Sequence, residues 1–450
     1  MLHLLFSDWR LAGGIPRCCQ FREYELDSDV RLYATGSASS SRHAEVNADK
    51  MVTCLPISCA TNNQHGENVP LNIAIVSGAK PTSGGGYDYE RGLKRLLARA
   101  TWQSDVTLRW FHFNPASGFA EGEGPDGLDL VEASELSRLN RRPGFFERRL
   151  FRKKPRHLIE EYLLDACIDL VYFTSPNPLA MQVTQIPIIS TVWDVGHRDY
   201  PEMPEFRGST WSSRERLYSS TLPRSFHVFT DSLATGASIS RYYGVLSNRW
   251  TALGITFDEG GNSTPNPVPP PEIPDQYFIY PARRWAHKNH AVLLRAMKVL
   301  LSDFPDVKLV LTGGPEGGSQ PIIEDSIRNL GLGDNVIDLG HVTEEKLVGL
   351  IAGAVSLVMP TYLGPTNIPP LQALGLGTPA IVSDSHVFDP VIQDHLTVVP
   401  ASDIGQWVVA MKAALATPLK REPLTHSDNQ TKILAEVLER FEQRMVNWKG

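Results

Sequence analysis

The sequence predicts an α/β fold with two Rossmann-like, doubly wound parallel-sheet domains that face each other across a cleft. The chain has 450 residues, more than one hydrophobic core usually organises. Short, branched apolar runs alternate with helix-like segments in two separate series. Between the series lies a proline-rich stretch, 258–275, typical of a stiff linker. Because ligands of such folds bind outside the carboxyl ends of the strands, we expect the functional site in the cleft.

The first domain is predicted at 71–257 and begins with the apolar run 71–76 (LNIAIV). An uninterrupted apolar run indicates a strand buried on both faces. A glycine loop and a helical pattern through Leu93, Leu96 and Leu97 follow it, which is the opening of a doubly wound unit. Further strand-like runs lie at 106–113, 170–174, 186–192 and 227–230.

The second domain is predicted at 276–420. Its expected strands lie at 277–280, 307–312, 336–339, 356–359 and 380–383, and its expected helices at 290–303, 321–330, 344–352 and 369–376. A long helix is predicted at 428–448, within a C-terminal segment (421–450) that we expect to pack back toward the first domain. Residues 1–70 show no sustained period of 2 or 3.6, which indicates a poorly structured extension to which we assign no function.

The composition is that of an ordinary globular protein, with 42% hydrophobic and 21% charged residues. A net charge of −7 argues against nucleic-acid binding by bulk electrostatics. We find neither a run of about 18 apolar residues nor a secretory signal, so a cytoplasmic location is expected. The five cysteines fit a reducing compartment. Since Cys54 and Cys59 lack a matching Cys or His cluster, they are read as ordinary thiols and not as zinc ligands.

Two segments of the second domain predict a cradle for a nucleoside diphosphate. The first, 280–289 (YPARRWAHKN), places Arg283 and Lys288 just after an apolar strand. The second, 360–373 (PTYLGPTNIPPLQA), places Thr366 and Asn367 at cap-like positions before a proline-initiated helix. Cations that face a helix N-terminus suit a diphosphate, because the first backbone N–H groups of the helix are unpaired and its dipole is positive there. The alternatives without a functional role are a solvated surface pair for the two cations and a simple helix cap for Thr366 and Asn367.

Other groups of the second domain are weaker candidates for binding the nucleotide. The glycine turn at Gly313 could let a nucleotide approach the backbone, and His341 follows another strand, although a plain βα turn would look the same. Gln372 lies one turn into the helix and could bind ribose hydroxyls, or it could be an ordinary helix-face residue. Arg284 and His287 are expected to point outward or to support their neighbours.

Two loops of the first domain are also candidates. The glycine loop with Gly84, Gly85 and Gly86 could accept a phosphate or an acceptor sugar on bare backbone N–H groups, although a lone glycine loop is a weak signal. The polar loop 191–201 follows a strand and contains Asp194 and His197. His197 could contact a substrate hydroxyl or sugar ring, or it could stabilise the turn.

A basic segment at 145–156 (FFERRLFRKKPR) stands out in an otherwise acidic chain. It could rest on an anionic membrane surface, which would make the protein peripheral to the inner face of a membrane, or it could hold an anionic acceptor. A solvated helix face is the alternative.

The motifs resemble those of the retaining glycosyltransferases of family 4, the group 1 transferases, which have the GT-B fold. The resemblance runs from 72 to 415 and is strongest over 280–384. The segments 278–282 with 288–290 resemble the donor-phosphate segment of the family, 311–314 its glycine turn, and 359–384 its donor-binding signature. In the first domain, 193–202 (WDVGHRDYPE) resembles a histidine loop found in a polysaccharide-building branch.

The resemblance implies that the protein transfers a hexose-type sugar from a UDP- or GDP-sugar to a saccharide or lipid-linked saccharide, in polysaccharide or cell-envelope glycan synthesis. His197, Arg283 and Lys288 are the implied catalytic residues. The acceptor would attack from the face that the diphosphate leaves, which retains the anomeric configuration without a protein nucleophile. Since no Asp-x-Asp motif lies in a suitable loop, we expect no metal and no cofactor.

The chain departs from the family signature at the positions of its two usual glutamates, where it has Gly364 and Gln372. A sugar-nucleotide-binding relative with impaired turnover therefore stays open as an alternative. A UDP-sugar epimerase shares the two-domain fold but needs catalytic carboxylates that we cannot place. A nicotinamide-dependent oxidoreductase is disfavoured, because the glycine loop lacks the G-x-G-x-x-G spacing.

Overall fold

The computed structural model describes residues 71–78, 85–99, 106–112, 158–254, 273, 276–315, 317–364, 368–385, 390–416, 422–424 and 429–449. The expected extension at 1–70, the basic segment 145–156, most of the linker 258–275, and Gly84, Thr366 and Asn367 lie outside the described residues. The domain boundaries and these residues' roles therefore stay predictions.

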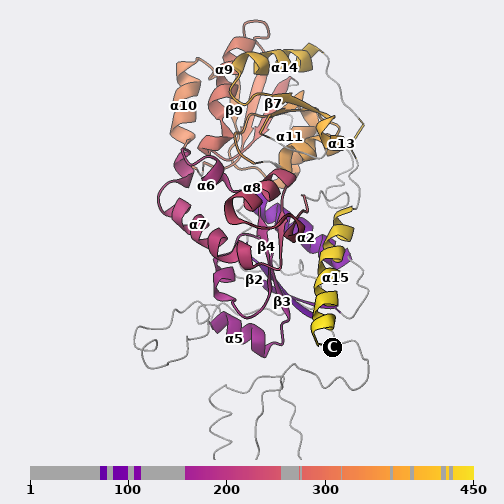
Figure 1. Cartoon of the computed structure of the whole chain (residues 1–450). Coiled ribbons are helices and arrows are strands. Elements are labelled where there is room, and N and C mark those ends of the chain that lie inside the picture. The colour runs from indigo at the N-terminus through magenta and orange to yellow at the C-terminus, as the bar shows by residue number, and fades with distance from the viewer. Residues whose placement is uncertain are drawn as a thin grey trace, which may run out of the picture.

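The prediction of two parallel sheets is confirmed. The first sheet has the strand order β2-β1-β3-β4-β5-β6, and all its described pairings are parallel. Its strands are β1 (Leu71–Ser77), β2 (Val106–His112), β3 (Leu170–Phe173), β4 (Ile188–Val192), β5 (His227–Thr230) and β6 (Trp250–Ala252). Figure 1 shows this sheet in the indigo and magenta half of the molecule.

The second sheet has the order β12-β11-β10-β7-β8-β9 and is also parallel throughout its described pairings. Its strands are β7 (Tyr277–Pro281), β8 (Lys308–Thr312), β9 (Val336–Asp338), β10 (Ser356–Met359), β11 (Ala380–Ser383) and β12 (Leu396–Val399). The chain runs outward from β7 to β9 and then crosses to the other side at β10. The strand order therefore reverses between β7 and β10, which is where open α/β sheets bind ligands.

Helices cover both sheets. Those of the first sheet are α2 (Gly85–Arg99), α5 (Leu158–Asp165), α6 (Gly196–Asp199), α7 (Ser209–Thr221) and α8 (Leu233–Tyr243). Those of the second sheet are α9 (His290–Leu300), α10 (Gln320–Asn329), α11 (Glu344–Gly353), α12 (Ile368–Gly375), α13 (Pro390–Gln393) and α14 (Ile404–Ala416). Short 3-10 turns lie at Pro178–Gln182, Pro204–Phe206, Leu222–Arg224, Ser247–Arg249 and Ala286–Lys288.

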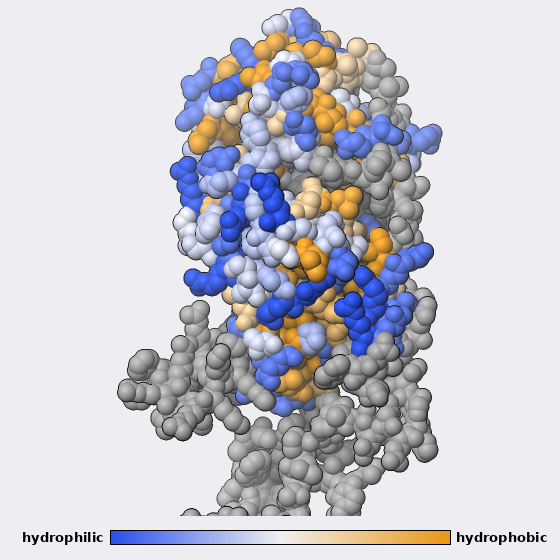
Figure 2. Space-filling model, in the orientation of Figure 1, coloured by the Kyte–Doolittle hydropathy of each residue, from blue (hydrophilic) through white to orange (hydrophobic). Residues whose placement is uncertain are grey.

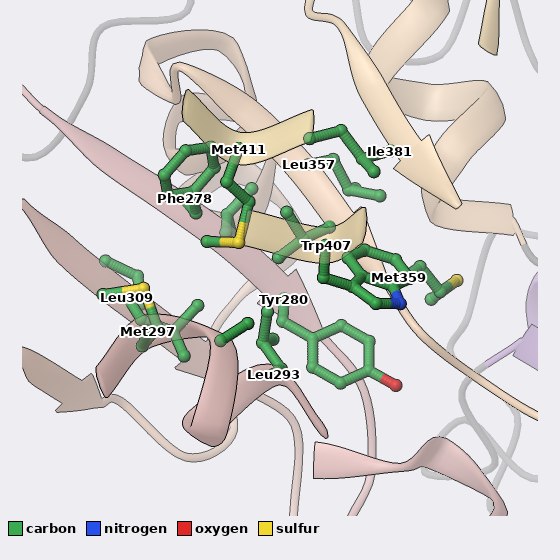
Figure 3. Packing of buried hydrophobic residues seen from close by; sticks show 14 of the residues in the cluster. Phe278, Tyr280, Leu293, Met297, Leu309, Leu357, Met359, Ile381, Trp407 and Met411 are labelled. Atoms are coloured by element: carbon green, nitrogen blue, oxygen red, sulfur yellow. The ribbon is translucent and has the colours of Figure 1, made fainter. Parts of the chain in front are cut away.

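The strands predicted as continuous apolar runs are the buried centres of both sheets. In β1, β3 and β7 every residue except Asn72 is buried. In the second domain, Trp407 and Met411 of α14 pack with Leu293 and Met297 of α9 over the strands (Figure 3). Burial of side chains this large stabilises the fold by about 1.5–3 kcal/mol each.

The last helix, α15 (Asn429–Lys449), packs against the first sheet although it follows the second in sequence. Leu434, Val437, Leu438 and Phe441 belong to the same buried cluster as β1 and α2. In Figure 1 this helix runs along the lower half, beside the strands of the first domain. These buried residues recur at helical spacing, as expected for a helix with one buried face.

Several of the described elements were not predicted from the sequence, among them β6, β12, α13 and α14. β6 has only three residues, and the middle residues of β12 are exposed, so neither is an apolar run. α14 carries apolar residues on several sides, which weakens the helical period. Short edge strands and buried helices lack the periodicity on which such predictions rest.

The surface is mixed in polarity. The exposed large hydrophobic residues come from different elements: Leu233, Leu246, Val299, Ile322, Val398 and Val409. Figure 2 shows hydrophobic residues interspersed with hydrophilic ones on the visible face of both halves. Scattered apolar residues of this kind are normal for a globular surface. Within the described part of the chain, no helix combines the length and the apolar character that a bilayer crossing requires.

Candidate functional site

The two segments that carry the predicted diphosphate cradle meet at the reversal point of the second sheet. The loop 282–289 follows β7 and the turn 360–364 follows β10, and these two strands are paired neighbours. Both loops therefore leave the same edge of the sheet, at the carboxyl ends of adjacent parallel strands. This is the position at which ligands bind in doubly wound folds.

Hydrogen bonds join the two loops directly. The backbone N–H of Tyr362 donates to the carbonyl of His287 at 2.8 Å, and the Thr361 hydroxyl donates to the same oxygen at 3.0 Å. The buried amide of Asn289 donates to the carbonyl of Pro360 at 3.0 Å and to a second carbonyl in the loop after β12. Asn289 has the left-handed φ of 53°, which a short amide side chain tolerates better than most. No local pattern in the sequence marks Asn289 as a connector, because its role depends on a contact 71 residues away.

Lys288 and Arg283 are half-buried at this edge. Burial lowers the pKa of the Lys288 ammonium to about 8, and attraction by Asp194 opposes that shift. The ammonium is therefore still charged at neutral pH but is poorly solvated. A partly dehydrated cation attracts an incoming anion more strongly than a fully hydrated one does.

Asp194 extends the site into the first domain, in the loop after β4. Burial alone would raise the pKa of Asp194, but the guanidinium of Arg214 and the N–H of Gly196 hold that pKa below its usual range. Its Oδ1 accepts from both groups. Since Asp194 also acts on Lys288, this loop and the cationic loop of the second domain lie close to one another.

A direct link between the domains is formed by Glu205 and His287. Oε1 of Glu205 accepts from the His287 N–H at 3.0 Å and pairs with its Nδ1 at 2.5 Å, while the neighbouring Phe206 ring stacks on the imidazole with centroids 6.4 Å apart. Burial lowers the pKa of His287, and the carboxylate opposes that shift. Glu205 was missed in the sequence, where only its nearness to the histidine loop could have drawn attention. His287 supports the cation loop, which was one of the two alternatives considered for it.

His197 is fully buried in the first domain. Its Nε2 lies 3.0 Å from the Tyr243 hydroxyl and 3.3 Å from Glu215. Burial, with repulsion by Arg214, lowers its pKa to about 4, so the imidazole is neutral near pH 7. Its Nδ1 has no partner among the described residues. This arrangement is the structural alternative considered above. The substrate contact predicted for His197 stays a prediction that requires this network to open.

The glycine turn after β8 serves the chain itself. Gly313 has φ 109°, its N–H donates to the Gly340 carbonyl at 2.7 Å, and a Cβ added to it would lie 2.5 Å from the carbonyl oxygen of Ala282. Glycine is needed there because the loop after β7 approaches its backbone. The structure thus gives Gly313 a role within the fold, and the approach of a nucleotide to its backbone stays a prediction. His341 is exposed beside this turn.

The turn before α12 is described only in part. Gly364 has φ 111°, a conformation that disfavours any side chain, and so the absence of the usual glutamate there has a backbone reason. Gln372 is half-buried within α12. Its placement one turn into the helix agrees with the sequence prediction, and its contact with ribose stays a prediction.

Gly85 and Gly86 form the start of α2 and lie against the second domain and the histidine loop. A Cβ at Gly85 would lie 3.4 Å from Ile368 at the start of α12, and one at Gly86 would lie 2.7 Å from the ring of Trp193. The starts of α2 and α12 are therefore close, and the missing side chain of Gly86 leaves room for the ring of Trp193. Phosphate or acceptor binding by this loop stays a prediction.

Arg284 is fully buried, so the supporting alternative is confirmed for it and the outward one is wrong.

The part of the chain that the structure describes brings no group of three His, Cys, Asp or Glu together in a way that could hold a metal ion.

Part of the chain is similar in sequence to known glycosyltransferases. Residues 269–429 match the family model "Glycosyl transferases group 1". Among curated proteins, the O-antigen chain mannosyltransferase RfbU of Salmonella typhimurium is 27% identical over 44% of this chain and 53% of its own length. An uncharacterized glycosyltransferase of Methanocaldococcus jannaschii, MJ1607, is 31% identical over 24% of this chain and 27% of its own. The chain thus spans about half, or less, of the length of these relatives.

Solved structures match a larger share of the chain. Sucrose-phosphate synthase from Thermosynechococcus elongatus aligns with a TM-score of 0.57 at 18% identity, over 84% of this chain and 98% of that protein. Anabaena HepE, solved with UDP and glucose, aligns with a TM-score of 0.57 at 14% identity over the same shares. At these identities the likeness establishes the fold, which is that of the GT-B glycosyltransferases, as the resemblance implied.

Proposed function

We propose that the protein is a retaining, metal-independent glycosyltransferase of family 4. It moves a hexose-type sugar from a UDP- or GDP-sugar to a saccharide or lipid-linked saccharide in polysaccharide or cell-envelope glycan synthesis. The observation that supports this most is the hydrogen-bonded junction between the Arg283–Lys288 loop and the turn before α12, at the reversal point of the second sheet. The family model covers this same junction.

The relatives support the substrate class. The Salmonella relative is named for adding mannose to an O-antigen chain, and HepE was solved with UDP-glucose. Both descriptions fit a hexose donor with a nucleoside diphosphate leaving group. A saccharide acceptor follows from the first of them.

Charge neutralisation is the proposed source of catalysis. As the glycosidic bond to the diphosphate breaks, negative charge grows on the leaving phosphate. Arg283, Lys288 and the N-terminal dipole of α12 stabilise that charge, a kind of contribution that reaches about 3–4 kcal/mol per donor in other enzymes. The acceptor hydroxyl attacks from the face that the diphosphate leaves, so the anomeric configuration is retained. Closure of the two domains excludes water from the donor.

A thermal-shift screen with UDP, GDP, UDP-glucose and GDP-mannose tests the donor site, because a ligand that binds only the folded state raises its melting temperature. We expect one base to be preferred, and stabilisation by its sugar nucleotide. Transfer to a saccharide acceptor should persist in EDTA, and NMR should find the product with the anomeric configuration of the donor. If none of the four compounds shifts the melting temperature, the proposed donor site is wrong.

A binding relative with impaired turnover is the second candidate, and Gly364 with Gln372 in place of glutamates favours it. The two functions differ in one measurement. A chain that is stabilised by a sugar nucleotide, yet neither transfers the sugar nor hydrolyses the donor, belongs to the second class. A gain of turnover in Gln372→Glu would then show that the lost carboxylate limits the reaction.

A further inference from the structure

Arg284 lies between the two cations of the proposed donor site but is 0% exposed. We propose that Arg284 is the positioning residue that holds three strand-end loops of the second domain in one arrangement: those after β7, β8 and β9. The role builds on the proposed function, since these loops carry Lys288, Gly313 and His341.

The guanidinium joins the first two loops through backbone carbonyls. Its Nη1 donates to Ala282 at 2.6 Å and to Thr312 at 3.1 Å. The backbone carbonyl of Arg284 in turn accepts from the N–H of Ser319 at 3.1 Å, just before α10. One side chain therefore connects the end of β7 to the end of β8, and its own backbone connects both to the next helix.

The third loop is held through a carboxylate. Nη2 of Arg284 donates to Oδ1 of Asp338 at 2.7 Å, and Nε donates to Oε1 of Gln320 at 3.1 Å. The same Asp338 oxygen accepts from the N–H of Gly340 at 3.0 Å, which fixes the backbone immediately before His341. The buried charge is thereby paired and hydrogen-bonded, as a buried charge must be.

A second path leads from Arg284 to Lys288. Nη1 lies 3.3 Å from Nε2 of His290, and burial lowers the pKa of that imidazole to about 3, so a neutral ring lies against the guanidinium. The ring of Tyr280 packs on His290 with centroids 4.8 Å apart, and its hydroxyl donates to the carbonyl of Lys288 at 2.5 Å. The backbone of the proposed phosphate-binding lysine is thus connected to Arg284 through two rings.

The geometry calls for arginine and for tight packing. A guanidinium has five N–H donors in a fixed plane, whereas an ammonium has three on a flexible stem. The loops have little room, because a Cβ at Gly313 would lie 2.5 Å from the Ala282 oxygen and one at Gly317 would lie 2.6 Å from the Arg284 oxygen. Small shifts of these loops would therefore displace the groups that bind the donor.

The test compares Arg284→Met and Arg284→Lys with Arg328→Met, which removes an exposed arginine of α10 that pairs with Asp325. Hydrogen exchange of the full chain without ligand reports on the three loops. Nucleotide affinity and the KM for donor and acceptor report on the site. Circular dichroism confirms that each variant is folded. If Arg284→Met does not fold, Asp338→Asn at the partly exposed partner takes its place.

We expect faster exchange in all three loops of Arg284→Met and a donor affinity about 10- to 100-fold lower, the scale of a small misplacement. The donor KM should rise while the acceptor KM stays unchanged, Arg284→Lys should restore part of the affinity, and Arg328→Met should match the wild type. Unchanged exchange, or faster exchange with unchanged donor affinity, overturns the positioning role. If the wild type binds no nucleotide while exchange still rises in the three loops, the donor assignment fails and the scaffold role of Arg284 stands.

Discussion

The loop after β7 and the loop after β4 differ in how their charges are used. Both are rich in polar residues, and both follow a buried parallel strand. In the loop after β7, Arg283 and Lys288 stay half-exposed, while the buried Arg284 and the carboxylate of Glu205 hold the backbone through hydrogen bonds. In the loop after β4, Asp194 is paired with Arg214, and Arg198 is paired with Glu215.

The helix α7 explains this difference. It supplies both Arg214 and Glu215, and it closes over His197. The charged groups of the loop after β4 are therefore paired within the first domain. In the second domain, Arg284 fixes the backbone of the loop after β7, and the neighbouring Arg283 and Lys288 remain half-exposed.

The largest expected effect is on Lys288. Lys288→Ala should remove detectable stabilisation by UDP or GDP, since a charge-assisted contact to the diphosphate contributes about 1.5–3 kcal/mol. The measurement is the ligand-induced shift in melting temperature. Lys298→Ala, an exposed lysine of α9, is the matched control. An unchanged shift in Lys288→Ala would refute our placement of the phosphate.

His197→Ala tests the loop after β4. If its role is structural, the free energy of unfolding falls by about 2–4 kcal/mol through the lost packing and hydrogen bonds. Denaturant unfolding measures the fall, and the exposed His341→Ala should leave the unfolding free energy nearly unchanged. A folded His197→Ala protein of normal stability that has lost transfer activity would instead support a catalytic histidine.

The pH dependence of nucleotide binding separates the two loops further. The Lys288 ammonium has a pKa of about 8 without ligand, and the diphosphate favours its charged form. Affinity should therefore be constant below pH 8 and should fall up to about tenfold per pH unit above it, because binding then takes up one proton. Isothermal titration calorimetry between pH 7 and 9.5 measures this. Lys288→Arg should lose the dependence, since a guanidinium stays charged throughout.

The same lysine affects stability with the opposite sign. Its folded pKa lies below the ordinary value of 10.5. Between about pH 8 and 10.5 the unfolded chain therefore binds more protons than the folded one, and this group's contribution to stability rises with pH. A fall in ligand affinity above pH 8 is thus distinct from alkaline unfolding.

Glu205→Gln tests the contact between the loops and has the smallest expected effect. It removes the charge of the link to His287 and keeps one acceptor, so we expect a loss of about 1 kcal/mol and a modest rise in donor KM. The exposed Glu202→Gln is the control. Thermal unfolding and donor titration measure both effects. No change in either would mean that this link contributes little to closure.

The sequence determined the two sheets, the order of most elements and the site candidates of the second domain. Strands buried on both faces are continuous apolar runs, and the cations after β7 and the turn after β10 are each visible in short motifs. These features are local, so they can be predicted without knowing which segments meet.

Only the tertiary structure decided which polar residues are buried and which distant partners they have. Asn289 joins loops 71 residues apart, Glu205 reaches His287 across the domains, and α7 neutralises the loop after β4. The sequence left Arg284 open as an outward or a supporting residue, and the fold makes it an internal connector. The physical reason is that pairing and burial of a charge depend on contacts between distant segments, which no local pattern records.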